Sequence, residues 1–483
     1  MGTDIPSVLP QDAVSYFYEG ARLMGIGDLP AAEVAFRRAL EISPDLSEAH
    51  INMGILLAND HRWQEAERHY RKALEIHPLQ MEAYLNFGGM LLAQKRFSEA
   101  EVAYRHALLI EPLSPGIWSS LGVLMACMQR EDEAERCYRK AMSVAPEYRK
   151  APFNLAYLLL RQGRYEEGWA CLEARDWYTQ IAQHLKCPRW HGESIAGKNL
   201  LISIEAGHGD MIQFCRYASL VKQRGCARLS VLCHPGLQRL FANVRGIDDV
   251  IALNEPLPAT AWDYWVPPLS LPFIFGTQLN TIPADLPYIF AEMGEAERWS
   301  HIVCSNDAAL RVGLVWRGNP RFENDADRSL GSLCELAPLG SVLGIRYFSL
   351  QKGVGEDEAQ FTPPFPIVDL SEHIKDFADT AAILMNLDLV ISVDTAVAHL
   401  AGALGKSCWL MLPAYKTDWR WLTDRNDSPW YPKVMRIFRQ TDTGDWSTVV
   451  ADMKSAFLAH GTKQRLVEAR RMAYGLSYDG KNI

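Results

Sequence analysis

LVISVDTAVAHLAGALGK, residues 389–406, is the segment that decides the fold of the carboxy-terminal two thirds of this chain. The apolar run 389–393 predicts a buried strand, and the small residues that follow predict a helix lying close to a sheet. Asp394 stands at the passage from strand to helix, where it is expected to cap a helix that starts at Thr395. The amides at Ala396 and beyond then favour an anion at this helix start.

His399 lies one turn beyond Thr395, on the same face of the expected helix. From there its imidazole is expected to reach a phosphate or a ribose of a bound ligand. The alternative is a core histidine whose hydrogen bonds are satisfied within the protein, and both readings stay open at this point.

Other apolar strands alternate with helix-length segments on the amino-terminal side of this segment and around it. A first series occupies 200–204, 228–233 and 249–253, and a second occupies 311–316, 346–351, 366–370, 389–393 and 407–412. Such alternation predicts parallel sheets covered by helices. We expect two doubly wound α/β halves, with 254–300 as loops and linker, and a ligand cleft at the carboxyl ends of the strands.

The first third of the chain repeats itself every 34 residues. The series are Pro44, Pro78, Pro112 and Pro146; Gly20, Gly54, Gly88 and Gly122; Ala32, Ala66, Ala100 and Ala134; Ala39, Ala73, Ala107 and Ala141; and Phe36, Tyr70, Tyr104 and Tyr138. Each unit predicts two helices that approach closely at the small residues, with aromatics between them and Pro ending the second helix. This resembles the tetratricopeptide repeat (TPR) over roughly 12–146, followed by a degraded fifth unit that caps an α-solenoid.

An asparagine recurs two residues before the repeat glycine, at Asn52, Asn86 and Asn154. Amide side chains can pair with a peptide backbone of any sequence, and the animal O-GlcNAc transferases, which this array resembles, carry an asparagine ladder at the corresponding position. The resemblance implies a protein or peptide partner in the groove of the solenoid, although Tyr18 and Ser120 interrupt the series. Hydrogen bonding within or between repeats is the alternative.

SVDTAVAHLAGALGK, together with the later WRWLTDRNDSPWYP, resembles bacterial TPR-containing glycosyltransferases related to the ADP-heptose:lipopolysaccharide heptosyltransferases. The resemblance covers about 190–440 and implies a GT-B fold, an inverting transfer from a nucleotide-sugar co-substrate, no other cofactor and no metal. It also implies that Asp394, Thr395, Ala396 and His399 contact the diphosphate and sugar of the donor. The family usually has Gly where this chain has Ala396, which narrows the space over the phosphate.

The loop IEAGHGD, 204–210, follows the first strand of the first half. The heptosyltransferases carry a Gly-Asp in this loop, and the resemblance implies that Asp210 is the general base that takes the proton of the acceptor hydroxyl. A helix cap is the alternative reading of Asp210. His208, two residues earlier, is a second candidate base.

Two further polar loops are expected to contact the donor. In 316–329, the resemblance implies that Arg328 lies against the phosphates, and Asn319 is a weaker candidate. In 349–353, Gln351 and Lys352 follow a strand where the family places nucleotide contacts, with a solvent-facing lysine as the alternative for Lys352. We take the D-x-D spelling at 325–327 as accidental.

Composition excludes several other classes of protein. The chain has 483 residues with 48% hydrophobic and 22% charged, and its net charge of −9 argues against non-specific binding to nucleic acid. Ten cysteines without C-x-x-C spacing disfavour zinc sites and a disulfide framework. No apolar run is long enough to span a membrane and no secretory signal stands at the start, so we expect a cytoplasmic protein.

These observations lead to one functional hypothesis with two alternatives. We expect a glycosyltransferase that moves a hexosyl-, heptosyl- or nonulosonyl-type sugar to a hydroxyl on a protein recruited by the TPR groove, in a layout that resembles flagellin-modifying enzymes. The first alternative is a non-catalytic interaction protein with a nucleotide-binding or degenerate GT-B part, and the second is a transferase for a lipid-linked glycan. The expected domains are 1–186 (TPR), 187–300 (acceptor side), 301–460 (nucleotide-sugar side) and a returning helix, 461–483.

Overall fold

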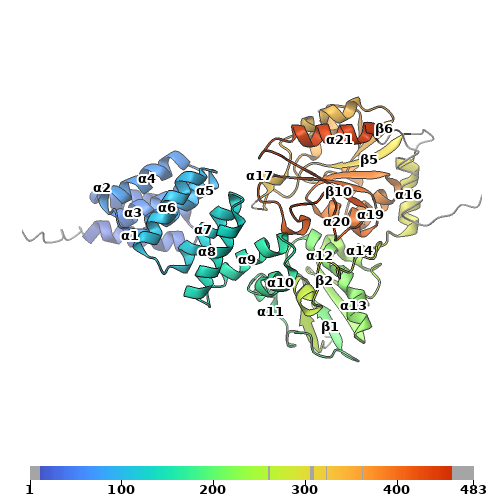
Figure 1. The fold of residues 1–483 in the computed structure, drawn as a ribbon, viewed down its shortest axis with the longest axis horizontal. Helices are drawn as coiled ribbons and strands as arrows, with labels where there is room; N and C mark the ends of the chain where they lie inside the picture. The colour runs from blue at the N-terminus through green and yellow to red at the C-terminus, as the bar shows by residue number, and fades with distance from the viewer. Residues whose placement is uncertain (1–10, 259–261, 305–308, 323, 362, 460–483) are drawn as a thin grey trace, which may run out of the picture. The chain divides into compact units, whose positions relative to one another are not determined.

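The structure is a computed structural model that describes residues 11–258, 262–304, 309–322, 324–361 and 363–459 (Figure 1). The chain divides into two compact units, of which the first ends at Leu158 and the second begins at Leu159. The predicted returning helix, 461–483, lies outside the described residues.

The first unit consists of paired helices with the predicted 34-residue period. The pairs are α1 (Gln11–Gly25) and α2 (Leu29–Ile42), α3 (Ser47–Asn59) and α4 (Trp63–Ile76), α5 (Met81–Ala93) and α6 (Phe97–Ile110), and α7 (Pro115–Cys127) and α8 (Glu131–Val144), followed by α9 (Lys150–Arg161). The prolines of the repeat stand just after the second helix of each pair, where a missing N–H ends the helix. The predicted α-solenoid of TPR type is confirmed.

Glycine recurs at one position of the repeat because an aromatic ring lies against its Cα. A Cβ at Gly88 would lie 2.7 Å from Cε1 of Tyr104, and a Cβ at Gly54 would lie 2.7 Å from Cε1 of Tyr70. These distances are below any normal contact, so only glycine lets the two helices of a repeat close onto the ring. The two sequence series, glycine and aromatic, are therefore two sides of one packing contact.

Gly88→Ala is expected to destabilise the repeat array by ~1–3 kcal/mol, because the new methyl group overpacks against Tyr104. The neighbouring Gly89 provides a matched control, since its Cβ would meet nothing nearer than Tyr104 Oη at 3.8 Å. Gly89→Ala is expected to be neutral or to stabilise by about 1 kcal/mol through helix propensity. Urea unfolding of the full chain followed by circular dichroism measures both, and equal effects of the two variants would contradict this packing account.

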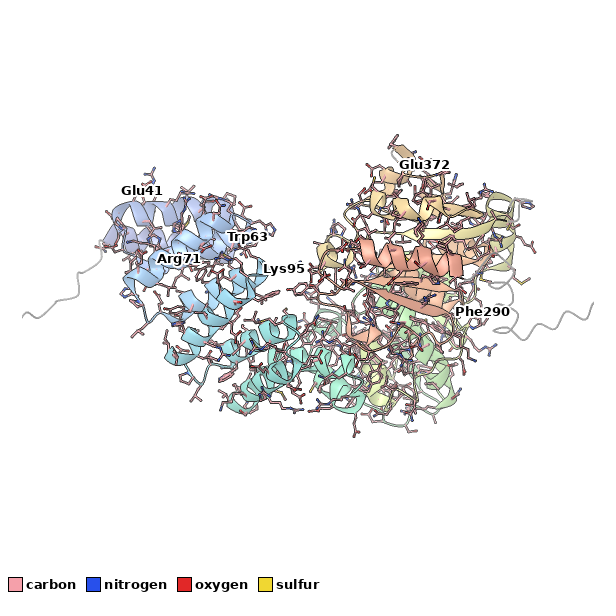
Figure 2. All side chains as sticks on the ribbon, turned by 45° about the horizontal axis from the view of Figure 1, so that its top comes forward. Glu41, Trp63, Arg71, Lys95, Phe290 and Glu372 are labelled. Carbon is pink, nitrogen blue, oxygen red and sulfur yellow. The ribbon has the colours of Figure 1, made fainter. Side chains whose placement is uncertain are left out.

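A ladder of ion pairs connects the second helices of successive repeats. Glu67 on α4 accepts from Arg96 of the next repeat, and its Oε1 lies 2.7 Å from Nη2 of Arg71 on its own helix. In the same way, Arg62 pairs with Glu33 of the preceding repeat. Arg130 likewise pairs with Glu101. Figure 2 shows Arg71 projecting from α4. The ion pairs between successive repeats thus connect each repeat to the next.

The second unit opens with helices that precede a four-stranded parallel sheet. Its first half comprises α10 (Tyr165–Leu172), α11 (Thr179–Ala182), β1 (Asn199–Ile202), α12 (His208–Phe214), α13 (Ala218–Gln223), β2 (Arg228–Cys233), α14 (Gln238–Phe241), β3 (Asp249–Ala252), β4 (Tyr264–Val266) and α15 (Leu271–Ile274). The helix α16 (Met293–Val303) follows and packs against α19 (Phe377–Asn386) of the second half. The strand order is β3-β2-β1-β4. Interpreting 254–300 as loops and linker was wrong at β4, at α15 and at the start of α16. The strand β4 is only three residues long and is followed directly by prolines, which obscures it in the sequence.

The second half of this unit is a six-stranded parallel sheet in the order β10-β9-β8-β5-β6-β7. Its elements are β5 (Leu310–Val315), α17 (Asp325–Arg328), β6 (Ile345–Ser349), α18 (Glu356–Phe361), β7 (Ile367–Asp369), α19 (Phe377–Asn386), β8 (Leu389–Val393), α20 (Ala396–Ala403), β9 (Cys408–Leu412), β10 (Met435–Arg439) and α21 (Ser447–Ala459). Figure 1 shows α21 on one side of this sheet and α19 and α20 on the other. The predicted α/β architecture is confirmed, and β10 adds a strand that was not predicted.

The predicted domain limits, 1–186, 187–300 and 301–460, remain predictions. The compact unit that begins at Leu159 already contains α10 and α11. Trp169 on α10 is buried there, and its indole Nε1 donates to the carbonyl oxygen of Thr277 at 2.9 Å. Trp169, from the second helix of the degraded fifth repeat, thus belongs to the interior of the second unit.

Candidate functional site

Each sheet of the second unit has one place where the order of its strands reverses. In the six-stranded sheet it lies between β8 and β5, and in the four-stranded sheet it lies between β1 and β4. At such a switch point the loops leave in opposite directions and open a crevice at the carboxyl ends of the strands, where α/β proteins bind their ligands. The helices that follow β1 and β8 are α12 and α20, which carry Asp210 and His399.

The first turns of α12 and α20 touch one another. A Cβ on Gly209 would lie 2.9 Å from Cδ2 of His399 and 3.5 Å from Cα of Ala396. Only glycine allows this approach, which explains the second glycine of the G-x-G in 204–210. The two switch points therefore meet at one seam, formed by two loops 190 residues apart in the sequence.

The helix after β8 begins one residue later than expected, at Ala396, with Thr395 as the N-cap residue. The prediction that Asp394 caps this helix was wrong. The hydroxyl of Thr395 lies 2.8 Å from Oγ of Ser392 and is thereby directed away from the amides of the first turn. Thr395, Ala396 and Val397 are half-buried, so the positive end of the helix remains accessible to a ligand.

Asp394 is a buried carboxyl group at the end of β8. Burial raises its pKa from 3.8 to about 6, the negative charge of Asp418 adds to this rise, and the positive charges of Arg328 and Arg420 oppose it. The group therefore lies within electrostatic reach of both arginines. Arg328, in the loop after β5, and Asp394, at the end of β8, thus lie near the same switch point, and a donor site shared by the two stays a prediction.

Asp394→Asn is expected to stabilise the second unit by ~1–3 kcal/mol at pH 7.5. As the pH rises from about 4 to 6, the unfolded chain releases the proton of Asp394 before the folded chain does, so the folded wild type loses stability over this window. The neutral amide removes that loss, and the two proteins should become equally stable near pH 4. Thermal unfolding at a series of pH values tests this, and a lower melting temperature of the variant at pH 7.5 would contradict it.

His399 is buried beneath α12, and its imidazole is neutral. Burial lowers its pKa well below the usual value, and the charges of Arg420, Arg216 and Arg328 lower it further. Its Nδ1 lies 2.8 Å from the hydroxyl of Tyr431, its Nε2 lies 4.0 Å from Oδ1 of Asp394, and its ring stacks on Trp421. Facing the seam, it can offer a hydrogen bond to a ligand but no positive charge.

Asp210 bridges the seam. Its Oδ1 accepts from Nη2 of Arg420, a residue of the other half, and its Oδ2 accepts from the backbone N–H of Gly207 at 2.9 Å. The carboxylate thus caps the first turn of α12, which was the alternative reading, and it also holds an arginine of the other half. A capping role does not exclude a role in catalysis, and the role of Asp210 as a base stays a prediction.

His208, the second candidate base, lies in an aromatic stack. Its ring lies 4.3 Å from that of His234 and 5.2 Å from that of Phe377, measured between centroids. Burial lowers its pKa to about 4, with His234 contributing to the effect. His208 is therefore neutral near pH 7, and at the start of α12 it packs against His234 and the start of α19.

The loop after β5 holds Arg328 in place and leaves Asn319 at the surface. Nε of Arg328 donates to Oδ1 of Asp325 at 3.2 Å, and its guanidinium covers the ring of Phe322. Asp325 is buried and also accepts from Ser329, which makes the first acid of D-x-D a support for this loop. Asn319 is exposed, and its Oδ1 accepts from the N–H of Arg321.

Gln351 and Lys352 are engaged in contacts within the second half. The buried Gln351 accepts from the amides of Trp316 and Arg317 and donates to the carbonyls of Arg317 and Val354, so it ties the loops after β5 and β6 together. Nζ of Lys352 lies 2.8 Å from Oε1 of Glu356 and 2.9 Å from the carbonyl of Ser371. Their proposed contacts with a donor stay predictions.

The segment 419–431 supplies candidate site residues that sequence reasoning missed. Arg420 and Tyr431 reach the seam directly, while the buried Arg216 on the opposite half donates to the carbonyl of Trp430 at 2.8 Å. The tryptophans of this segment are buried. The alternating W-R-W at 419–421 was the available signal, since it places a charged residue between two core residues.

The asparagines of the repeat array lie on its first helices. Nδ2 of Asn86 donates to the carbonyl of Glu82 at 2.8 Å, and Nδ2 of Asn154 donates to Oγ of Ser119 at 3.1 Å. Asn52 is half-buried. Hydrogen bonds within and between repeats, which was the alternative reading, thus account for two of the three amides, and peptide binding by the three residues stays a prediction.

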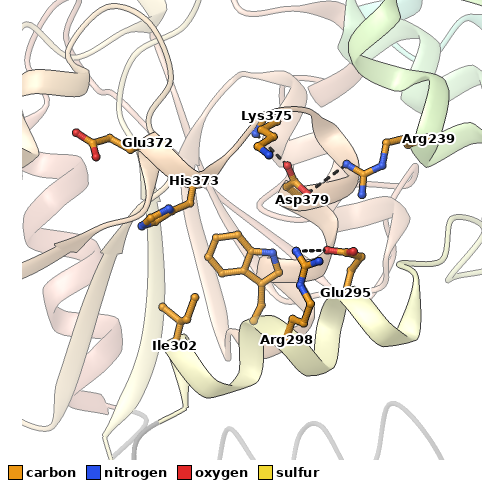
Figure 3. A pocket seen from close by; sticks show the side chains of 9 residues that line it. Arg239, Glu295, Arg298, Ile302, Glu372, His373, Lys375 and Asp379 are labelled. Atoms are coloured by element: carbon orange, nitrogen blue, oxygen red, sulfur yellow. Dashed lines mark hydrogen bonds and ion pairs between the residues drawn. The ribbon is translucent and has the colours of Figure 1, made fainter.

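A hollow of about 650 Å³ lies elsewhere in the second unit (Figure 3). It is lined by Arg239, Glu295, Arg298, Trp299, Ile302, Glu372, His373, Lys375 and Asp379. Opposite charges face each other within its walls, with Arg239 3.3 Å from Asp379 and Arg298 2.9 Å from Glu295. All of its lining residues differ from the predicted site residues, so the hollow is separate from the seam.

Across the described ranges, no group of three or more His, Cys, Asp or Glu side chains is arranged to hold a metal ion. Within the same residues, no helix combines the length and the apolar character that crossing a membrane requires.

Comparison with known proteins identifies the repeats. Residues 45–110 and 129–179 match the tetratricopeptide repeat. Protein FlbA of Caulobacter vibrioides is 25% identical over 328 residues, which cover 63% of this chain and 54% of FlbA. The chain is also similar to PilF of Pseudomonas aeruginosa, with 20% identity and a TM-score of 0.35, over 44% of this chain and 86% of that one. It is similar to MamA of Desulfovibrio magneticus RS-1 with 20% identity and a TM-score of 0.30, over 36% of this chain and 96% of that one. This is a TPR-containing protein, and its repeats indicate interaction with other proteins.

Proposed function

We propose that the chain is a glycosyltransferase of GT-B type that moves a sugar from a nucleotide-sugar donor to a hydroxyl on a protein. The observation that carries this is the seam, at which the switch points of two parallel sheets meet. It combines an accessible helix start at Ala396, the arginine Arg328 and a carboxylate, Asp210, on the opposite half.

These residues suit the charges of such a transfer. The start of α20 and Arg328 would hold the diphosphate of the donor and stabilise its charge as it leaves. Asp210 would take the proton of the acceptor hydroxyl while the acceptor oxygen bonds to the anomeric carbon. The bond from that carbon to the phosphate oxygen breaks on the opposite side, and its electron pair leaves with the nucleoside diphosphate, which gives inversion.

The repeat array supports a protein as the acceptor, because stacked TPR units present an extended groove to other proteins. In this role, Asn52, Asn86 and Asn154 would contact the backbone of the acceptor. The oxygen of an asparagine whose amide nitrogen bonds within the array can still accept a hydrogen bond from a peptide N–H.

A second candidate function is favoured by the contacts of Asp210. Both of its oxygens are engaged, one by Arg420 and one by the amide of Gly207. A carboxylate fixed in this way also suits a scaffold that binds a nucleotide at the seam without transferring a sugar. Activity measurements distinguish the two functions, whereas binding alone does not.

The experiment is a thermal-shift screen of the full chain against UDP, ADP, GDP, CMP and their sugars, followed by an assay for released nucleotide. One of the ligands is expected to raise the melting temperature, because binding to the folded state adds to its stability. Release of nucleotide from that sugar donor supports the transferase, and binding without release supports the scaffold. A complete panel without any shift would contradict both.

A further inference from the structure

Arg420 is the cation that connects the two halves of the second unit at the seam. Its Nη2 donates to Asp210, its Nε donates to Oε1 of Gln213, and its Nη1 lies 3.0 Å from Oδ1 of Asp418. Asp210 and Gln213 belong to α12, whereas Asp418 belongs to the half of Arg420 itself. One guanidinium therefore spans both halves, and its side chain is 7% exposed.

The surroundings of Arg420 leave its guanidinium little freedom. It lies over the ring of Trp419, 4.3 Å from the ring centre, and near the ring of Phe214. Trp419 is itself packed edge-on against Trp169 of α10, with 5.2 Å between centroids. The backbone N–H of Arg420 donates to Oδ1 of Asp418 at 2.9 Å, which fixes the turn that carries it.

A rigid donor on one oxygen of Asp210 and a backbone amide on the other fix the plane of this carboxylate. A planar guanidinium in contact with neighbours on several sides defines direction as well as charge, which a lysine ammonium does not do. Asp210 follows Gly209, which touches the first turn of α20, so the carboxylate fixed in this way lies beside the seam where the proposed function places the acceptor hydroxyl.

We propose that Arg420 is the positioning residue for Asp210, an inference that rests on the proposed transferase function. Arg420 holds the carboxylate at the seam and keeps its charge throughout, while Asp210 receives the proton. It acts through Asp210 and not through the donor, so its loss lowers kcat and leaves the KM for the nucleotide-sugar unchanged.

A structural clasp between the halves is the competing explanation, and the chain contains a matched control for it. Arg239 on α14 also joins the two halves, with Nη1 2.8 Å from Oδ2 of Asp376 and 3.3 Å from Oδ1 of Asp379. Arg239→Lys therefore weakens a second ionic contact between the halves without touching Asp210. The side chain of Arg239 is 45% exposed and that of Arg420 is 7% exposed, so the melting temperatures of the two lysine variants show how much each contact stabilises the fold. If clasping were the whole role of Arg420, its effect on kcat would follow from that loss of stability and would not depend on Asp210.

The test is a double-mutant cycle between Arg420→Lys and Asp210→Asn on the full chain, with nucleotide release from the sugar donor found in the screen as the readout. Arg420→Lys is expected to lower kcat ~10–100-fold with KM unchanged, and Arg239→Lys is expected to lower it less than ~3-fold. In the Asp210→Asn background, Arg420→Lys should add less than ~3-fold, because the residue it positions has already lost its function. Melting temperatures of all variants check that they fold.

The outcomes distinguish a failure of the positioning role of Arg420 from a failure of the proposed transferase function. Independent, multiplying effects of the two substitutions, or an equal loss in Arg239→Lys, overturn the positioning role while the transferase stands. A wild-type chain that binds a nucleotide-sugar but never releases the nucleotide overturns the proposed function, and the positioning role falls with it.

Discussion

Asp210→Asn is expected to lower sugar transfer ~10²–10⁴-fold while the affinity for nucleotide stays the same. The amide has the shape of the carboxylate, so its oxygen can still accept from Arg420 or from the N–H of Gly207, the two donors that hold Asp210 in place. What it loses is the ability to take a proton. The measurement is single-turnover release of nucleotide, together with the thermal shift given by the same nucleotide.

Asp418→Asn is the matched control for this variant. Asp418 shares Arg420 with Asp210, at 3.0 Å from Nη1, but it belongs to the same half as the arginine. We expect its amide variant to retain transfer within ~10-fold, because no proton is transferred to Asp418. Similar losses in the two variants would show that the charge balance around Arg420 matters and that Asp210 is not a base.

Glu205→Ala is expected to destabilise the second unit by ~3–5 kcal/mol. Glu205 and Arg175 form an ion pair whose side chains are both 0% exposed, with Oε1 2.6 Å from Nε. Removing the carboxylate leaves the guanidinium inside the protein with a large part of its charge uncompensated, and this costs more than the contact itself contributes. Glu205 stands in the loop between β1 and α12, so the change should also loosen the segment that carries Asp210.

Unfolding in urea, followed by tryptophan fluorescence, measures this loss of stability. Asp427→Ala serves as the control, because it removes an ion pair with Arg425 in which both side chains are at least 36% exposed. Such pairs contribute little, since water screens them, and the unfolding midpoint should hardly change. A Glu205→Ala variant as stable as this control would show that the buried charge of Arg175 does not depend on Glu205.

The sequence allowed the repeat array and most of the sheet strands to be predicted, because each is encoded by local spacing. The contact between Gly88 and Tyr104 recurs in every repeat, so it is visible as a period. The strands β2 and β8 were predicted at their observed limits, because buried strands in parallel sheets are continuous apolar runs. In contrast, β4 is very short, and two of the five residues of β10 are arginines, which hides an edge strand.

The candidate site was predictable only in part, because its decisive contacts connect distant segments. Asp394 and Asp210 could be selected from their positions after strands. Arg420 could not, since it reaches Asp210 across 210 positions of sequence and only the packing of the two halves brings them together. Gln351 shows the opposite case, in which a polar residue expected to face a ligand uses its amide to join two loops.

The central claim is that the start of α20 holds the leaving diphosphate, and a crystal structure tests it most directly. The full chain is crystallised with the nucleoside diphosphate that gives the largest thermal shift. The account predicts phosphate oxygens within hydrogen-bond distance of the backbone amides of Ala396 or Val397 and of the guanidinium of Arg328. A nucleotide bound with its phosphates elsewhere, for example in the hollow beside Trp299, would contradict it.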